Sequence, residues 1–467
     1  MKFKKIAPGD LAFFKSVAGE GHVFMDEDSL RLAARDETED LEYLPEVIMQ
    51  PVSSREISEV LKYCNEQRIP VTVRGAGTGL SGGALPVYGG VVLDTRRLNR
   101  ILNLDAQNFQ VMVEPGVITQ VLQEYVLEHG LFYPPDPASC GSCFIGGNVA
   151  ENSGGPKAVK YGVVKDYVLN LEVVLPDGEI IWTGANVLKN ATGYNLTQLI
   201  VGSEGTLAVV TKIVLRLIPA VKHTVLMLAP FRSSVEACRV VNEIMLAGIT
   251  PSALEFMERN AILWAMEYTQ NSTISLADDI QAHLLIELDG NDMDMLQKQA
   301  EQVMEVLSHF DTGEILFADS HEQKQILWAL RRKVGEAVKK HSVYKEEDTV
   351  VPRAALPELL AAVKQIGLAY GFNSVCYGHA GDGNLHMNII KENMSDEDWN
   401  NKLPVAIREL FTETVRLGGT ISGEHGIGLV QKGYMDIAFG KTALNLMKGI
   451  KATFDPNGIL NPGKIFP

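Results

Sequence analysis

Three histidines and one glutamate stand among glycines in two short stretches of the chain. His379 and His386 occupy Gly-His-Ala-Gly-Asp-Gly-Asn-Leu-His, and Glu424 and His425 occupy Gly-Glu-His-Gly. Two imidazoles and one carboxylate suit a divalent metal and leave coordination positions open for a substrate. The residue types therefore predict a metal held by His379, His386 and Glu424. His425, next to a ligand, is the candidate base, since an imidazole pKa can lie near working pH.

Each histidine alone also fits a plainer reading, because histidines beside turns are often surface residues. The second cluster favours a site, since the glycines on both sides of Glu424 and His425 permit close approach of a bound group to the backbone. Zinc, iron and manganese all accept two imidazoles and a carboxylate, so the identity of the metal stays open.

A strand, a turn and a second strand are expected to position the first two histidines. Residues 374–377 are β-prone, Gly-Asp-Gly-Asn supplies turn residues, and residues 385–390 alternate as a strand does. His379 and His386 would flank this loop and meet across the hairpin. Asn388 lies two residues after His386, on the same strand face, and is a candidate substrate contact.

Composition limits the classes of function. The chain has 467 residues, which suggests two large domains or about three smaller ones, and a net charge of −16. That charge argues against nucleic acid or an anionic membrane surface as a partner. An anionic substrate would therefore need local cations. The N-terminus lacks the apolar region of a secretory signal, and no apolar run is long enough to span a bilayer, so a cytoplasmic protein is expected.

The cysteines suggest no cluster of their own. Five cysteines at uneven spacing make no disulfide framework, and Cys140 and Cys143 form a lone Cys-x-x-Cys without a second pair. Neither a zinc ribbon nor an iron–sulfur cluster is expected. Electrons from any redox reaction would have to leave through another protein or a diffusible acceptor.

The order of predicted elements indicates an α+β protein. Residues 1–45 are charged and partly helical, and residues 46–220 mix short strands with helices and many glycines. In residues 221–467 the predicted strands each lie near a longer amphipathic helix. Two strand–helix units in this last part predict an antiparallel sheet with helices on one face. The predicted strands are residues 71–74, 91–94, 111–113, 171–175, 224–228 and 282–288, and the predicted helices are residues 56–67, 119–129 and 295–310, with a helical region from residue 321.

A glycine-rich loop follows the strand at residues 71–74. Gly77, Gly79 and Gly82 formally match the dinucleotide pattern G-x-G-x-x-G, which requires a helix to open there. Pro86 and the glycine pair before residue 91 rule out that helix, so the nicotinamide reading fails. A loop rich in backbone N–H groups can still wrap a pyrophosphate. Two further glycine-rich segments, at residues 134–155 and 199–207, favour a large phosphate-bearing cofactor.

Together these segments carry a resemblance to a known family. The ordered motifs are RGAGTGLSGG, PPDPAS, IGGNVAENSGG, GSEGTL, GHAGDGNLH, SGEHGIG and DPNGILNPGK. They resemble the FAD-linked 2-hydroxyacid dehydrogenases of the vanillyl-alcohol-oxidase superfamily, of the glycolate oxidase flavoprotein subunit and D-lactate dehydrogenase type. The resemblance covers essentially the whole chain.

The resemblance implies a two-subdomain FAD-binding domain of the PCMH type at residues 46–220. An α+β FAD-oxidase C-terminal domain with an antiparallel sheet would follow at residues 221–467, its terminal segment returning to the flavin. The pyrophosphate would lie in the loop of residues 74–83. Relatives that attach FAD covalently often use a histidine in or near this loop, and none is present, so non-covalent FAD is expected.

The residues that the resemblance places at the cofactor come from four segments of the chain. Cys143 among them is expected to pack in the flavin loop without acting as a redox thiol, and Tyr161 either approaches the flavin or only packs. The implied cofactor-binding residues are Arg74, Gly75, Ala76, Gly77, Thr78, Gly79, Ser81, Gly82, Pro135, Asp136, Ser139, Gly141, Cys143, Gly146, Gly147, Asn148, Asn152, Gly154, Gly155, Tyr161, Gly162, Glu204, Gly205 and Asn461.

The resemblance also implies the substrate-binding residues. Arg331 and Lys345 match the family's carboxylate-binding positions, and a guanidinium suits bidentate carboxylate binding. Apart from the resemblance, Arg331 would be read as part of a solvated basic helix face. Relatives that oxidise dicarboxylic hydroxy acids place a hydroxyl side chain one turn after this arginine. Gly335 stands there in this chain and favours a short substrate.

The expected reaction is FAD-dependent, metal-assisted oxidation of glycolate or D-lactate to the 2-oxo acid, with hydride transfer to flavin N5. Electrons would pass to an iron–sulfur subunit, an electron-transferring flavoprotein or a quinone-linked chain. A place at the membrane periphery through such a partner stays open beside the cytoplasmic location. A D-2-hydroxyglutarate-type dehydrogenase and a flavin-binding electron carrier with a structural metal stay open as alternatives. The acceptor and the oligomeric state, for which a homodimer is one candidate, also stay open.

Overall fold

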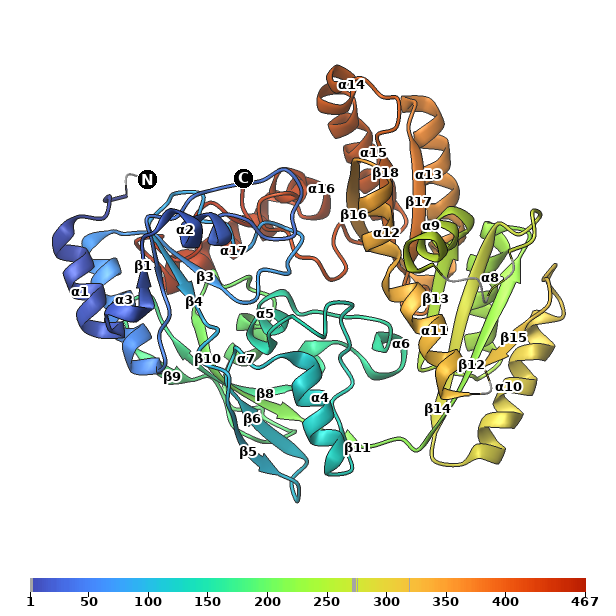
Figure 1. Ribbon diagram of the computed structural model, residues 1–467, viewed down its shortest axis with the longest axis horizontal. Coiled ribbons are helices and arrows are strands. Elements are labelled where there is room, and N and C mark those ends of the chain that lie inside the picture. Colours follow the sequence, from blue (N-terminus) through green and yellow to red (C-terminus); the bar gives the residue numbers. More distant parts are fainter. Residues whose placement is uncertain (1–2, 271–273, 275, 319) are drawn as a thin grey trace. The chain divides into compact units, whose positions relative to one another are not determined.

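The computed structural model describes residues 3–270, 274, 276–318 and 320–467. Met1 and Lys2 of the predicted N-terminal segment lie outside the described residues. The chain forms two compact units, drawn in Figure 1. The first unit consists of Met1–Ser153, Val163–Ala220 and Glu424–Pro467, and the second of Gly154–Gly162 and Val221–Gly423.

Three sheets build the first unit. One is a mixed four-stranded sheet in the order β1-β2-β4-β3, in which β4 is parallel to both neighbours. The second is an antiparallel five-stranded sheet in the order β5-β6-β10-β8-β9, and the third pairs β7 with β11. The strands are β1 (Val23–Phe24), β2 (Val47–Met49), β3 (Val71–Arg74), β4 (Val91–Asp94), β5 (Ile101–Asp105), β6 (Gln110–Val113), β7 (Leu131–Phe132), β8 (Val168–Val174), β9 (Ile180–Trp182), β10 (Val209–Arg216) and β11 (Ile218–Pro219).

Helix α3 (Ser54–Gln67) shows how the sequence forms the helices of this unit. The Ser53 side chain caps it by accepting a hydrogen bond from the Glu56 N–H. Ile57, Leu61 and Cys64 recur at helical spacing and are fully buried. The unit's helices are α1 (Pro8–Ala18), α2 (Glu27–Ala33), α3, α4 (Thr119–Glu128), α5 (Ile145–Glu151), α7 (Leu196–Ile200), α16 (Met435–Ala438) and α17 (Lys441–Phe454), with short 3₁₀ turns at Glu20–His22, Val164–Asp166 and Lys432–Tyr434.

The loop after β3 carries no helix, as the sequence predicts. Residues 75–90, all of which the structure describes, form turns and bends before β4 begins. A helix-opening dinucleotide site is therefore absent from this loop.

One antiparallel seven-stranded sheet forms the centre of the second unit, which confirms the predicted α+β class with an antiparallel sheet. Its strand order is β15-β12-β14-β13-β17-β18-β16. The strands are β12 (His223–Phe231), β13 (Ala253–Glu258), β14 (Ala282–Gly290), β15 (Leu316–Ala318), β16 (Tyr344–Val350), β17 (Asn373–Gly378) and β18 (Asn384–Ile390).

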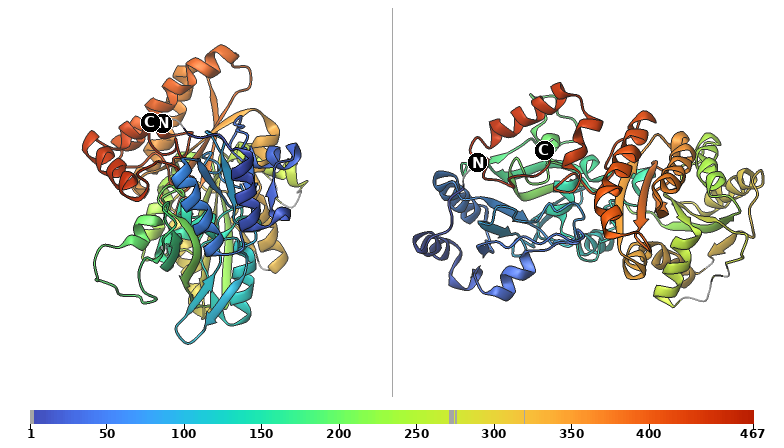
Figure 2. Two further views of the ribbon diagram at one scale, coloured as in Figure 1. Left: turned by 90° about the vertical axis from the view of Figure 1, so that its left-hand side faces the viewer. Right: turned by 90° about the horizontal axis from the view of Figure 1, so that it is seen from above.

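Helices cover both faces of this sheet, so the prediction of helices on one face is wrong (Figures 1 and 2). One group, α9, α11 and α12, packs on the face that carries Leu228, Leu285 and Tyr377. The other group, α8, α10 and α13, packs on the opposite face, and α15 contacts α13 and β16. These helices are α8 (Ser234–Leu246), α9 (Arg259–Thr269), α10 (Met293–Leu307), α11 (His321–Arg332), α12 (Val334–His341), α13 (Leu356–Tyr370) and α15 (Leu403–Arg416), and the 3₁₀ turn Arg353–Ala355 precedes α13.

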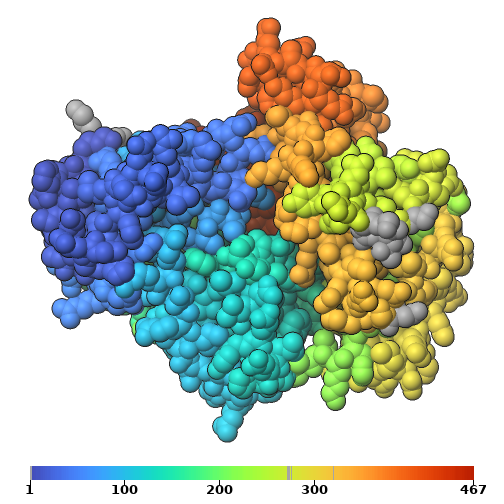
Figure 3. All heavy atoms as spheres, viewed as in Figure 1, coloured from blue at the N-terminus to red at the C-terminus, as the bar shows by residue number. Residues whose placement is uncertain are grey.

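Two shorter helices complete the second unit. The helix α6 (Ala158–Tyr161) lies in the segment that joins this unit from the middle of the first, and it contacts β13. The helix α14 (Asp396–Asn401) lies at the end of the projection formed with α13 and α15, visible in Figure 3. Among the described helices, none combines the length and the apolar character needed to cross a membrane.

Candidate functional site

An open cavity lies in the first unit, and the three glycine-rich segments of the sequence meet at its walls. Backbone N–H groups in such segments suit a phosphate-bearing cofactor. The lining includes Gly75, Ala76, Gly77, Thr78, Gly79, Ser139, Cys143, Gly146, Gly147, Asn148, Glu204, Gly205 and Asn461 from the predicted cofactor-binding set, together with Glu151, Glu424 and His425.

Glycine allows this cavity to reach the backbone. A Cβ on Gly79 or Gly147 would meet nothing within 4 Å, so both positions open into space. A Cβ on Gly75 would stand 3.9 Å from the backbone of Gly147, so the first two glycine segments approach each other closely. Gly77 has φ +77°, and a Cβ there would collide with the Arg74 guanidinium. The Arg74 side chain thus packs against the backbone of this loop at Gly77.

The remaining predicted cofactor residues lie outside the cavity lining. Asn152 ends α5 in a left-handed conformation, and its amide oxygen accepts a hydrogen bond from the Lys165 N–H. Tyr161 belongs to the second unit, where its hydroxyl donates to Asp289 over 2.8 Å, which favours the packing alternative for this tyrosine. The predicted residues that do not line the cavity are Arg74, Ser81, Gly82, Pro135, Asp136, Gly141, Asn152, Gly154, Gly155, Tyr161 and Gly162.

The second glycine-rich segment, residues 134–155, contains a short helix. Its sequence predicts a loop instead. Residues Ile145–Glu151 form α5, although glycine disfavours helix. A Cβ on Gly146 would clash with Pro115, so the helix packs closely there. Burial raises the pKa of the neighbouring Cys143 thiol, in line with a packing role for this cysteine.

Buried carboxyl groups line the same cavity. Glu204 accepts hydrogen bonds from the N–H groups of Ile427 and Gly428, at 2.8 and 2.7 Å, and so holds the segment that carries Glu424 and His425. Burial and the charge of Glu204 raise the pKa of Glu151 well above its ordinary value. Glu151 Oε2 is buried without a hydrogen-bond partner among the described residues. A bound polar cofactor would supply a partner, so the residues fit FAD.

In the second unit the predicted hairpin brings His379 and His386 together. Tyr377 on β17 pairs with His386 on β18, and His379 follows β17 directly. The two imidazole rings lie edge to face, with centroids 5.5 Å apart. Gly383, at φ +86°, sits in the turn between the strands, where a Cβ would collide with the Val351 carbonyl. The prediction that these histidines meet across a hairpin is confirmed.

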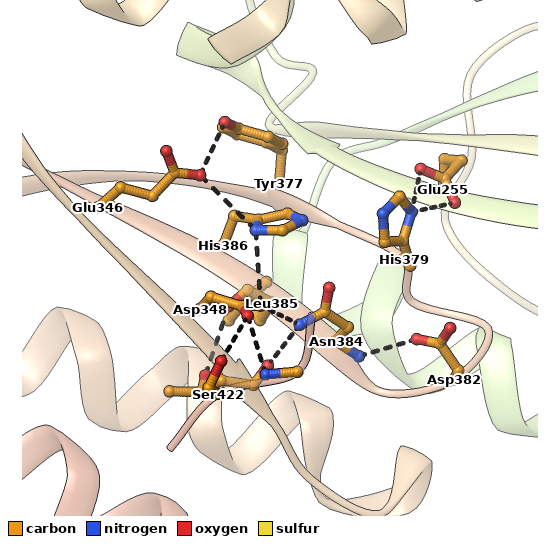
Figure 4. A network of polar contacts seen from close by, with 12 residues as sticks. Glu255, Glu346, Asp348, Tyr377, His379, Asp382, Asn384, Leu385, His386 and Ser422 are labelled. Atoms are coloured by element: carbon orange, nitrogen blue, oxygen red, sulfur yellow. Dashed lines mark hydrogen bonds and ion pairs between the residues drawn. The ribbon is translucent and has the colours of Figure 1, made fainter. Parts of the chain in front are cut away.

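A carboxylate binds one nitrogen of the His379 ring, and two carboxylates lie near the His386 ring at longer distances. His379 Nδ1 lies 2.9 and 2.8 Å from the two carboxylate oxygens of Glu255. His386 Nδ1 lies 3.6 Å from Glu346 Oε1 and 3.7 Å from Asp348 Oδ1. In Figure 4 the other nitrogen of each ring points toward the other histidine. Orientation of an imidazole by a carboxylate at its far nitrogen is typical of metal-binding histidines, so this pair fits a divalent cation.

Charge supports the same assignment. Glu255 and Asp348 are fully buried, and the Glu346 side chain is 13% exposed. One guanidinium, Arg331, lies 2.7 Å from Glu255. Burial would raise the pKa of Glu255, but the charges of His379 and Arg331 outweigh it and hold the pKa below its ordinary value. A divalent cation would offset the remaining negative charge of this group.

Asp348 also holds the chain next to the second histidine cluster. Its Oδ2 accepts hydrogen bonds from the Gly423 N–H at 2.8 Å and from the Ser422 hydroxyl at 3.3 Å, and its Oδ1 accepts from Asn384 at 2.6 Å (Figure 4). Glu424 and His425 themselves belong to the first unit. Their joining the histidine pair stays a prediction.

Arg331 and Asn388 lie on the same face of the seven-stranded sheet as His386. Arg331 is 5% exposed, and its guanidinium stands 5.2 Å from the ring centre of Tyr377. Asn388 is fully buried and pairs across the strands with Val375 and Glu346. The two candidate substrate contacts are therefore close to one tyrosine.

The structure does not bring Lys345 to this face. Lys345 pairs with Ile389, whereas Glu346 pairs with Asn388 and Asp348 pairs with His386. Because side chains alternate along a strand, Lys345 points to the opposite face of the sheet. The site face at this point carries Glu346 instead, so Lys345 does not fit the predicted carboxylate-binding role.

Sequence reasoning missed the carboxylates and the tyrosine of this site. Glu346 and Asp348, two residues apart before a Val-Val-Pro stretch, could have been found as one face of a strand. Glu255 stands alone between apolar residues, and nothing in its neighbourhood signals a site. Its role depends on strands that are distant in the sequence.

Comparison with known proteins identifies the family. A model described as FAD linked oxidases, C-terminal domain, matches residues 220–465, and a model described as FAD binding domain matches residues 45–184. The chain belongs to the FAD-linked oxidases. It is 38% identical to a D-lactate dehydrogenase of Anaerostipes hadrus over 425 residues, which covers 90% of this chain and 89% of that protein.

A second relative of this FAD-linked oxidase is the glycolate oxidase subunit GlcD of Bacillus subtilis. It is 38% identical over 434 residues, which covers 92% of this chain and 91% of that protein. Among solved structures, p-cresol methylhydroxylase with bound substrate has a TM-score of 0.80 at 18% identity and covers 99% of this chain and 98% of its own. That likeness shows the fold. The chain is an FAD-linked oxidoreductase, homologous to D-lactate dehydrogenases and glycolate oxidase subunits.

Proposed function

We propose that this oxidoreductase oxidises a short D-2-hydroxy acid, glycolate or D-lactate, to the 2-oxo acid. The observation that carries the proposal is the histidine pair on the β17–β18 hairpin: Glu255 binds Nδ1 of His379, two carboxylates lie near Nδ1 of His386, and the two rings lie edge to face. A metal held there suits a substrate with a hydroxyl group next to a carboxylate. The names of the two relatives, a D-lactate dehydrogenase and a glycolate oxidase subunit, support the same substrate class.

In this proposal His379, His386 and Glu424 hold the metal, and the cavity of the first unit holds FAD without a covalent bond. Bound FAD supplies a hydride acceptor, and the bound metal supplies a Lewis acid next to the hydroxyl group. His425 accepts the hydroxyl proton as the C2 hydrogen leaves with its electron pair. Zinc, iron and manganese all suit the three ligands.

Arg331 binds the substrate carboxylate in the proposal. Its NH2 group pairs with Glu255, while its Nε–H has no hydrogen-bond partner among the described residues. A buried donor without a partner is costly, and a substrate carboxylate would satisfy it. Asn388 adds an amide contact on the same face. We further propose that the two electrons leave to a separate acceptor protein, because the name of the B. subtilis relative describes it as a subunit.

Anaerobic absorbance spectroscopy of the purified protein tests the function. We expect a flavin band that D-lactate or glycolate bleaches and L-lactate does not. Removal of the metal with a chelator should abolish bleaching while FAD stays bound, and adding zinc, iron or manganese should restore it. A flavin band that no short hydroxy acid bleaches would contradict the proposal and favour an electron-carrier subunit or a longer substrate.

A further inference from the structure

We propose that Glu346 is a specificity-determining residue that excludes 2-hydroxy acids with a second carboxylate. The inference rests on the proposed function, and it defines the substrate class as monocarboxylic. Glu346 lies beside the candidate metal ligand His386, and the proposed function gives it no part in binding the substrate. Its carboxylate lies among the groups that would surround the substrate, and its charge has the same sign as the substrate's.

The strand register places Glu346 on the site face. It pairs with Asn388, and His386 pairs two residues further on with Asp348. Glu346 Oε1 lies 3.3 Å from the Tyr377 hydroxyl and 3.6 Å from His386 Nδ1. The side chain is 13% exposed, so water screens its charge poorly.

Tyr377 connects Glu346 with the candidate substrate residues. The centre of the tyrosine ring lies 5.2 Å from the Arg331 guanidinium and 5.3 Å from the centre of the His386 ring. A Cβ on Gly335 would stand 3.2 Å from the Tyr377 hydroxyl, so the start of α12 reaches the same place. A substrate that binds both Arg331 and a metal at His386 would therefore lie near the Glu346 carboxylate.

Three cations that reach this face, among the described residues, pair with carboxylates of the protein. Arg331 pairs with Glu255. Lys157 and Lys160, which also reach this face, pair with Glu287 and Asp289. Lys345, the cation next to Glu346 in sequence, points to the opposite face. A second substrate carboxylate would meet Glu346 without a cation of its own, which disfavours its binding.

The test compares two substrates of equal chain length, D-2-hydroxypentanoate and D-2-hydroxyglutarate, which differ in the second carboxylate. We expect Glu346→Gln to raise the ratio of kcat/KM for the dicarboxylate over the monocarboxylate roughly tenfold or more. The control is Glu347→Gln, which removes the same charge from the opposite face of β16 and should leave the ratio unchanged. Oxidation of D-lactate by the wild type and by Glu347→Gln reports on the proposed function itself.

A second readout does not require turnover. The shift of the flavin band measures the affinity of the oxidised protein for 2-oxopentanoate and for 2-oxoglutarate. The wild type should bind the monocarboxylate more tightly. Equal binding of the two would overturn the inference even if Glu346→Gln failed to fold. An unchanged kcat/KM ratio in Glu346→Gln, with D-lactate still oxidised, would overturn the inference and leave the proposed function standing. A wild-type flavin that no hydroxy acid reduces would overturn both.

Discussion

The buried carboxylate of Glu255 links the two kinds of chemistry that the second unit is proposed to perform. Both of its oxygens contact Nδ1 of the candidate metal ligand His379, and one also pairs with the candidate substrate cation Arg331 at 2.7 Å. Metal position and substrate position would then depend on the same side chain. The role of Glu255 in positioning both groups can be tested by measuring the affinity for the metal as well as the rate of the reaction.

Replacement of Glu255 by glutamine should weaken metal binding by roughly 10- to 100-fold, because the imidazole of His379 would lose its orienting carboxylate. Metal content after dialysis against graded chelator gives the affinity. The matched control is Glu258→Gln on the same strand, since Glu258 bonds the Cys376 N–H and Lys364 and no histidine. Equal metal loss in both variants would point to general destabilisation of β13 and contradict the role of Glu255.

His283 on β14 should make the folded state sensitive to acid. Burial, and then the charge of Arg259, lower the pKa of His283 from 6.5 to about 4. Between these values the unfolded chain binds a proton that the folded chain does not, so stability is lost as the pH falls from about 6.5 to 4. The loss from this group is roughly 3 kcal/mol at most. The free energy of unfolding of His283→Asn, measured in urea, should depend less steeply on pH in this range. The control is His309→Asn, which changes an exposed histidine and should keep the wild-type slope. Equal slopes in the wild type and His283→Asn would contradict the assignment.

At the scale of elements, local patterns were predictable and pairings between distant strands were not. The β17–β18 hairpin follows from turn residues and alternation within a few positions, and Gly383 fits a turn that no side chain could occupy. β16 joins the same sheet through its pairing with β18, and a shift of one position decides which face a side chain takes. The resemblance to the family pointed to Lys345 as a site residue, whereas the strand register places Glu346 on the site face.

Helix prediction failed where packing outweighs propensity. The Ile-Gly-Gly-Asn stretch of α5 reads as a loop because glycine disfavours helix, yet Gly146 allows that helix to approach Pro115 more closely than a Cβ would permit. The coverage of both sheet faces by helices likewise depends on the strand order β14-β13-β17-β18, which combines segments far apart in the sequence. Neither the helix α5 nor the coverage of both sheet faces produces a periodic pattern in the sequence.

At the scale of the whole molecule, the chain leaves the first unit after Ala220 and returns to it at Glu424. The returning segment contributes Asn461 to the lining of the cavity that is proposed to hold FAD. The amide oxygen of Asn461 accepts the Val73 N–H at 3.0 Å, and its amide nitrogen donates to the Glu204 carbonyl at 2.7 Å. Leu460 forms a parallel bridge to Val71 next to it. The last residues of the chain thus join β3, which precedes the first glycine loop, to the third glycine segment.

Asn461→Ala should therefore lower both thermal stability and FAD retention. The substitution leaves a buried N–H and a buried carbonyl without partners, at a cost of roughly 2–5 kcal/mol in total, and its φ of +43° suits asparagine better than alanine. The control Asn457→Ala removes an amide from the same segment that bonds Asn65, outside the cavity lining. We expect the flavin-to-protein ratio after gel filtration to fall in Asn461→Ala and to hold in Asn457→Ala. Full flavin content in Asn461→Ala would show that the glycine segments hold FAD without the returning chain.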